Sequence, residues 1–160
     1  MITGSSRPVA LGLGGNLGEP RETFRRACAL LAAGAVSDLR MASCHQSEAV
    51  GCHPGTPPFT NSALIGRWHG TAQELLELTQ EIEVQLGRPR IHDSQGNRSI
   101  DIDILLLGDL ILNSPGLHIP HPRMGQRLFV LQPLAEIAPD WIVPTNGKTV
   151  AQIMKELKTG

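Results

Sequence analysis

The chain has 160 residues, and its 14 Lys and Arg residues against 15 Asp and Glu residues give a formal net charge of −1. This balance excludes a general electrostatic attraction to nucleic acid or to a membrane surface. The length suits one domain over residues 1–160, with a largely aliphatic core because only 3% of the residues are aromatic. No stretch approaches the ~20 apolar residues of a membrane span, and the first residues lack an apolar signal core, so we expect a cytoplasmic protein.

The first predicted elements are a short buried strand over 9–14 and a helix that begins at Glu19 and Pro20. The glycine-rich turn between them is not a dinucleotide fingerprint, because Leu17 stands where the third glycine belongs. Proline is permitted in the first turn of a helix. The apolar stripe of this helix consists of Phe24, Ala27, Cys28 and Leu31.

Residues 36–50 look extended, and a Gly- and Pro-rich loop follows over 51–58. Cys44-His45 and Cys52-His53 could suggest zinc, but the spacing fits no standard pattern and strand neighbours face opposite ways. Three cysteines without a framework spacing do not indicate structural disulfides. We therefore interpret 51–58 as a surface loop, a place where functional groups often lie.

The next strand, 59–68, carries Asn61, which is either a local turn residue or a deliberately placed hydrogen-bonding group. Thr71 and Glu74 form a capping box for the following helix. Its buried stripe consists of Leu75, Leu78, Ile82 and Leu86. Its other face presents Leu76, Gln80, Glu83 and Gly87, which is either a solvated surface or a second functional stripe.

The strand at 98–108 alternates Ile with Asp and then becomes wholly apolar. On a strand, Asp101 and Asp103 point to one face, about 7 Å apart. Two carboxylates this close repel each other and are costly to desolvate, so a cation such as Mg²⁺ between them would stabilise the pair. The alternative is an edge strand whose polar face lies in water.

A turn at Gly108 and Asp109 precedes a short return over 110–112. Residues 117–122 are extended because of their prolines, and 127–134 is a short apolar segment with one charge. Thr149 and Gln152 cap a last helix that runs to about residue 157. The order β-α-β-β-α-β predicts an α+β, ferredoxin-like antiparallel sheet with helices packed on one face, plus a short C-terminal extension.

The arginines and the histidine around the paired Asp together suggest one chemical hypothesis. Arg88, Arg98 and Arg127 could neutralise phosphate oxygens near the paired Asp. His121, held between two prolines, could donate to a phosphate or ribose oxygen. This pattern indicates phosphoryl or pyrophosphoryl transfer from a nucleotide without a P-loop.

The sequence resembles the 6-hydroxymethyl-7,8-dihydropterin pyrophosphokinase family of folate biosynthesis. The motifs that carry the resemblance lie at 13–18, 59–61, 86–88, 98–104, 119–122, 127–131 and 133–139. The most specific are Arg-Ser-Ile-Asp-Ile-Asp-Ile at 98–104 and Ile-Pro-His-Pro at 119–122. The resemblance implies transfer of the β,γ-pyrophosphoryl group of ATP to the hydroxymethyl oxygen of the pterin, with release of AMP.

The resemblance also implies a role for each matching position. Asp101 and Asp103 would bind two Mg²⁺ ions and, with Arg88 and Arg98, form the catalytic set. The ATP-binding positions are Leu76, Gln80, Glu83, Arg88, Arg90, Arg98, Ile104, His121 and Arg127. The pterin-binding positions are Glu48, Ala49, Val50, Phe59, Asn61, Asp101 and Phe129. We expect a monomer, able to associate with other folate enzymes.

The match to the family has gaps. Gln95 stands where family members usually carry an aromatic residue that folds over the pterin, and Asn97 replaces a common proline. Residues 52–58 have no clear counterpart. Two alternatives to this enzyme are a non-catalytic ferredoxin-like module that binds a metal or ligand, and a metal-dependent nuclease, although a nuclease would want a more basic surface.

Overall fold

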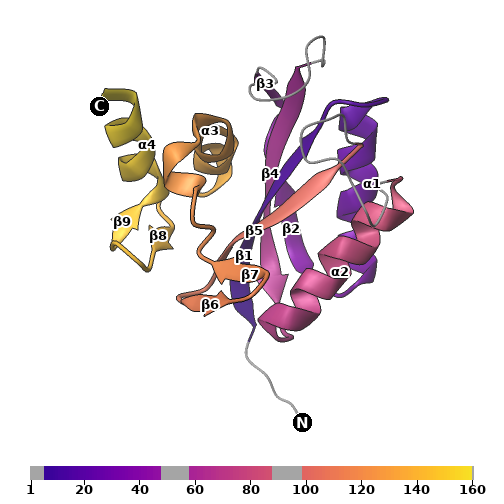
Figure 1. Cartoon of the computed structure of the whole chain (residues 1–160), viewed down its shortest axis with the longest axis horizontal. Helices are drawn as coiled ribbons and strands as arrows, with labels where there is room; N and C mark the ends of the chain where they lie inside the picture. The colour runs from indigo at the N-terminus through magenta and orange to yellow at the C-terminus, as the bar shows by residue number, and fades with distance from the viewer. Residues whose placement is uncertain (1–5, 48–57, 88–98, 160) are drawn as a thin grey trace.

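The computed structural model describes residues 6–47, 58–87 and 99–159 (Figure 1). The first part of the chain forms β1 (Arg7–Gly15), α1 (Pro20–Ala33), β2 (Ser37–Met41), β3 (His45–Ser47), β4 (Phe59–Trp68), α2 (Ala72–Gln85) and β5 (Asp101–Leu107). The rest forms β6 (Leu112–Ser114), β7 (Leu117–Ile119), the 3-10 turn η1 (Met124–Gln126), α3 (Leu128–Ile137), β8 (Ile142–Val143), β9 (Lys148–Thr149) and α4 (Val150–Thr159). Within the described ranges, no helix has both the length and the apolar character that crossing a membrane requires.

The main sheet is antiparallel and has the strand order β2-β4-β1-β5, with β3 also paired to β4. Without the short β3, the elements follow the order β1-α1-β2-β4-α2-β5. This is the predicted βαββαβ arrangement, so the ferredoxin-like α+β prediction is confirmed. The predicted strand over 59–68 coincides with β4.

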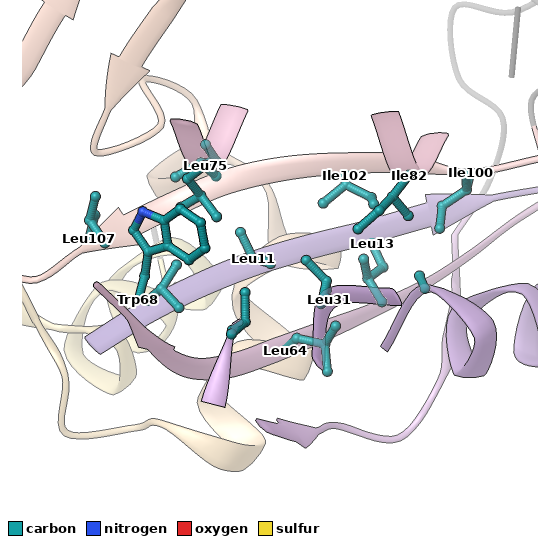
Figure 2. Packing of buried hydrophobic residues seen from close by; sticks show 14 of the residues in the cluster. Leu11, Leu13, Leu31, Leu64, Trp68, Leu75, Ile82, Ile100, Ile102 and Leu107 are labelled. Carbon is teal, nitrogen blue, oxygen red and sulfur yellow. The ribbon is translucent and has the colours of Figure 1, made fainter. Parts of the chain in front are cut away.

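One face of the sheet is covered by α1 and α2. Val9, Leu11 and Leu13 of β1 project into this layer and are buried with Phe24 of α1 and Leu75 of α2. Figure 2 shows the packing, with Leu11 and Leu13 lying between side chains of the neighbouring strands and both helices. Alternation along β1 therefore places every second side chain in this core.

The opposite face is covered in part by the C-terminal helices. Ala10 of β1 and Leu105 of β5 pack with Leu131 and Leu134 of α3, and Val150 of α4 joins the same cluster. Figure 1 shows α3 and α4 on the other side of the sheet from α1 and α2. The two helices of the predicted plan, α1 and α2, do share one face. The expectation that only this face carries helices was wrong, because residues 128–137 form a further helix, α3, whose apolar side chains pack on the opposite face.

The local helix signals behave as predicted. Thr71 Oγ1 accepts from the Glu74 backbone N–H (3.1 Å), and Glu74 Oε1 accepts from the Thr71 backbone N–H (2.8 Å). Thr149 and Gln152 exchange the same pair of hydrogen bonds at the start of α4. Both capping boxes satisfy backbone donors that have no partner within the helix.

The segment after β5 differs from the prediction. Residues 110–112 do not return along β5; instead β6 pairs with β7 in a separate two-stranded sheet. The Ile119–Pro120 peptide bond is cis. Pro133 lies inside α3, where it cannot donate to the carbonyl four residues earlier.

Candidate active site

Asp101 and Asp103 project from β5 toward the face that α3 partly covers. In the register, Asp101 lies opposite Gly14 and Asp103 opposite Gly12. Opposite residues of an antiparallel pair share a face of the sheet, and β1 carries small residues on this side. Both carboxylates are only partly exposed. The strand thus presents two acidic groups side by side over a stretch of β1 that has no side chains to cover them.

Asn61 lies in the same cross-strand row, because Gly14 pairs with both Asp101 and Asn61. Its side chain is 5% exposed, and its Nδ2 donates to Ser47 Oγ at 2.7 Å. A Cβ built on Gly14 would lie 3.4 Å from Asn61 Oδ1. The sequence left open whether Asn61 is a turn residue or a hydrogen-bonding group within the strand. In the structure it is a buried strand residue with an oriented amide, not a turn residue.

Two phenylalanines come from elements on this face of the sheet, β4 and α3. Phe59 is two residues before Asn61 on β4 and so points to the same face. Phe129 lies in the first turn of α3 and is 40% exposed. The guanidinium carbon of Arg127 is 5.7 Å from the centre of the Phe129 ring, a cation–π contact. An exposed ring on a helix that packs against this sheet face is suited to contact a flat ligand.

His121 is held beside the end of β5 by its backbone N–H, which donates to the carbonyl of Leu105 at 3.0 Å. The ring Nδ1 accepts from the Arg123 backbone N–H at 3.2 Å, so the neutral ring carries its proton on Nε2. Burial, and then the charges of Arg127 and Arg123, lower the pKa of His121, while Asp101 opposes them. The ring is thus a neutral donor within the electrostatic reach of Asp101 and Arg127.

The proposed ATP stripe on α2 lies beside the outer edge of β5. Glu83 Oε2 accepts from the backbone N–H of Ile102 at 2.6 Å, the residue between the two Asp. Gln80 is exposed, whereas Leu76 packs against the core that α1 and α2 cover. The side chain of Ile104 is 5% exposed in that core, so at this position only the backbone remains for a ligand to contact.

Several predicted site residues lie outside the described ranges. They are Glu48, Ala49, Val50, Arg88, Arg90 and Arg98. The same holds for Gln95 and Asn97, at which the sequence departs from the family pattern, and for Cys52 and His53.

The acidic pair has the character of a site completed by a ligand. Across the described ranges, no three His, Cys, Asp or Glu side chains gather into a group able to hold a metal. Mg²⁺ is commonly held by one or two carboxylates together with waters and substrate phosphates, so Asp101 and Asp103 fit a metal that arrives with a nucleotide. Zinc at Cys44-His45 is not supported, because Cys44 packs against the core while His45 faces α3.

This face also carries a second polar cluster that the sequence did not predict. Ser43, His45 and Glu136 hydrogen-bond to one another between β3 and α3. Nothing in the local sequence links Ser43 to a residue 93 positions away. The available signal was indirect: Glu136 is seven residues after Phe129, so the two lie on the same side of a helix.

Comparison with known proteins relates the chain to one family. The family model described as 7,8-dihydro-6-hydroxymethylpterin-pyrophosphokinase matches residues 10–139. A 2-amino-4-hydroxy-6-hydroxymethyldihydropteridine pyrophosphokinase of Synechocystis sp. is 40% identical over 150 residues, which are 93% of this chain and 75% of that protein. The protein of the same name from Bacillus subtilis is 41% identical over 128 residues, 79% of this chain and 75% of the relative.

A solved structure supports the fold. The Plasmodium falciparum HPPK-DHPS structure with pterin and p-hydroxybenzoate aligns with a TM-score of 0.73 at 12% identity. The alignment covers 96% of this chain but 43% of that one, so the chain spans less than half the length of that protein. At this identity the likeness supports the arrangement of helices and strands alone.

Proposed function

Because the chain belongs to the 7,8-dihydro-6-hydroxymethylpterin-pyrophosphokinase family, we propose that the sheet face carrying Asp101 and Asp103 is where its reaction takes place. The chain is an enzyme of folate synthesis that transfers the pyrophosphoryl group of ATP to 6-hydroxymethyl-7,8-dihydropterin. The pterin hydroxymethyl oxygen attacks the β-phosphorus, and the bond from that phosphorus to the α,β-bridging oxygen breaks. AMP therefore leaves, and the pterin keeps the diphosphate.

The proposal for the metal centre is that Asp101 and Asp103 hold two Mg²⁺ ions through their carboxylates. The observation that carries it is the register, in which both Asp share one face opposite Gly12 and Gly14. When bound, the ions would neutralise the triphosphate and make the substrate hydroxyl a better nucleophile. Glu83 supports this arrangement from the strand edge, since its carboxylate is hydrogen-bonded to the backbone between the two Asp.

For the pterin, the proposed site is the row from Asn61 to Asp101, with Phe59 and Phe129 beside it. The Asn61 amide is buried and held by Ser47, which suits a group that must read the donor and acceptor edge of a flat ring. Phe129 offers an exposed face for stacking. Gly14 leaves the space above β1 open between Asn61 and Asp101.

For ATP, the proposed contacts are His121 and Arg127 on one side and the α2 stripe, Leu76, Gln80 and Glu83, on the other. Because the pKa of His121 is lowered, its ring is neutral and can donate one N–H hydrogen bond to ATP. The positive charge that balances the phosphates would then come from the arginines. Ile104 would contribute backbone groups, because its side chain is buried. Arg88, Arg90 and Arg98 are assigned to the triphosphate, and Glu48, Ala49 and Val50 to the pterin, by the resemblance.

The direct experiment is to incubate the purified chain with ATP, Mg²⁺ and the pterin and to resolve the nucleotides. We expect AMP and the pterin diphosphate in equal amounts, and neither when the pterin is omitted. Formation of ADP, or no turnover, would overturn the proposed function. Full activity in EDTA would overturn the metal centre alone. Sedimentation of the same sample tests the proposal of a monomer, and a single cooperative unfolding transition would support one domain over residues 1–160.

A further inference from the structure

Ser43, His45 and Glu136 form a hydrogen-bonded group, which we call the α3–β3 clamp. The Glu136 carboxylate accepts from Ser43 Oγ at 2.7 Å and from the Ser43 backbone N–H at 3.1 Å. His45 Nε2 lies 3.1 Å from Glu136 Oε1. Three contacts to one carboxylate connect Ser43, which precedes β3, and His45, the first residue of β3, to the second half of α3.

The clamp involves both elements that carry the proposed walls of the pterin site. His45 pairs directly with Asn61 across β3 and β4, and Ser47, two residues on, holds the Asn61 amide. Glu136 is two helical turns after Phe129 and on the same side of α3. The clamp therefore joins the strand that orients Asn61 to the helix that carries Phe129.

The geometry argues against a hydrolytic Ser-His-Glu triad. Ser43 Oγ lies 3.4 Å from His45 Nε2, the same ring nitrogen that contacts Glu136. In a triad the acid holds one ring nitrogen and the serine uses the other. Ser43 also donates directly to Glu136, so its hydroxyl proton is already committed to the carboxylate.

The clamp favours the ionised form of the Glu136 carboxylate but contributes little to the free energy of folding. Hydrogen bonds from the Ser43 hydroxyl, His45 and the Ser43 backbone lower the pKa of Glu136. The side chain of Glu136 is 41% exposed and that of His45 30%, and ion pairs in such positions contribute little to folding. We therefore expect the cluster to act on geometry, because its hydrogen bonds hold α3 at a fixed distance from β3.

We propose that Ser43, His45 and Glu136 are positioning residues that set the distance between Asn61 and Phe129 and thereby the fit of the pterin. This proposal rests on the proposed function, since it assumes that Asn61 and Phe129 are the two walls of the pterin site. The hydrogen bonds given for the clamp join Ser43, His45 and Glu136 to one another, and none of the three is a predicted ATP position or a member of the Asp pair. We therefore expect the loss of the clamp to affect the pterin alone.

The test is steady-state kinetics on purified full-length variants. In Glu136→Gln and Ser43→Ala we expect the KM for the pterin to rise about tenfold, the factor expected when one or two hydrogen bonds are lost. The KM for ATP and kcat stay unchanged. Ser43→Thr keeps the hydroxyl and restores the KM for the pterin toward the wild-type value. Both positions are exposed, so the variants keep the fold.

Glu156→Gln is the matched control. It removes a carboxylate from an exposed ion pair with Lys148 (2.8 Å) at α4 and β9, and all constants should stay at wild-type values. An unchanged pterin KM in Glu136→Gln, a joint rise of both KM values, or no rescue by Ser43→Thr would overturn the clamp. A wild-type enzyme that forms no AMP would instead overturn the proposed function.

Discussion

The two faces of the central strand β1 differ in the size of their side chains and in what covers them. Val9, Leu11 and Leu13 point to the face covered by α1 and α2, and all are at most 3% exposed. Ala10, Gly12 and Gly14 alternate with them and point to the face that α3 partly covers. The first face is closed by large aliphatic groups, whereas the second leaves the backbone open between Asn61 and the Asp pair.

This difference separates stability from chemistry on a single sheet. Large apolar side chains removed from water supply the main favourable term in folding. Burying a polar group costs free energy that its partners must offset, so a face lined by carboxylates and amides contributes less to folding than the closed face. A substitution on one face should therefore change mainly stability, and a substitution on the other mainly catalysis.

The largest effect is expected from Asp103→Asn, which keeps the size of the side chain and removes its charge. The value of kcat/KM should fall about 10³-fold or more, because a metal ligand is lost. Because Asn has nearly the same size as Asp, the variant should fold, and its circular dichroism spectrum should match that of the wild type. Asp109→Asn, in the exposed turn after β5, serves as control, and near-normal turnover in Asp103→Asn would contradict the metal assignment.

On the closed face, Phe24→Ala should lower the free energy of unfolding by about 3–5 kcal/mol, because Phe24 is fully buried and its removal leaves a cavity. Urea unfolding measures this loss. Ile142→Ala, at a 53% exposed residue, should cost about 0.5 kcal/mol or less. At a temperature where Phe24→Ala remains folded, its KM for both substrates should match the wild type; a selective rise for one substrate would show that the faces are not independent.

The smallest effect is expected on the pH dependence of stability, through His121. Its pKa is lowered in the folded chain by burial, Arg127 and Arg123, so the unfolded chain binds the proton more readily. The unfolding free energy should therefore be complete above the ordinary histidine pKa of about 6.5 and decrease as pH falls through it. Urea unfolding at pH 7.5 and 5.5 in EDTA should show a smaller decrease for His121→Asn than for the wild type. An equal decrease in both would contradict the origin of the shift.

Much of the fold could be predicted because its signals are local. The Thr71 and Glu74 capping box, Pro20 at the start of α1 and the alternation of Asp and Ile at the start of β5 each depend on residues a few positions apart. The extra layer formed by α3 could not be predicted in this way. Pro133 weakens the helical pattern, and which face α3 covers depends on long-range packing.

For the candidate site, the sequence by itself determined the chemistry: the alternation of Asp101 and Asp103 places two carboxylates on one face, and His121 is fixed among prolines. The tertiary structure decided which residues meet, because strand register brings Asn61 and His45 into one row with Asp101 through Gly14. It also decided that Glu136 reaches Ser43. Periodicity acts over a few residues, whereas register and helix placement depend on the packing of the whole sheet.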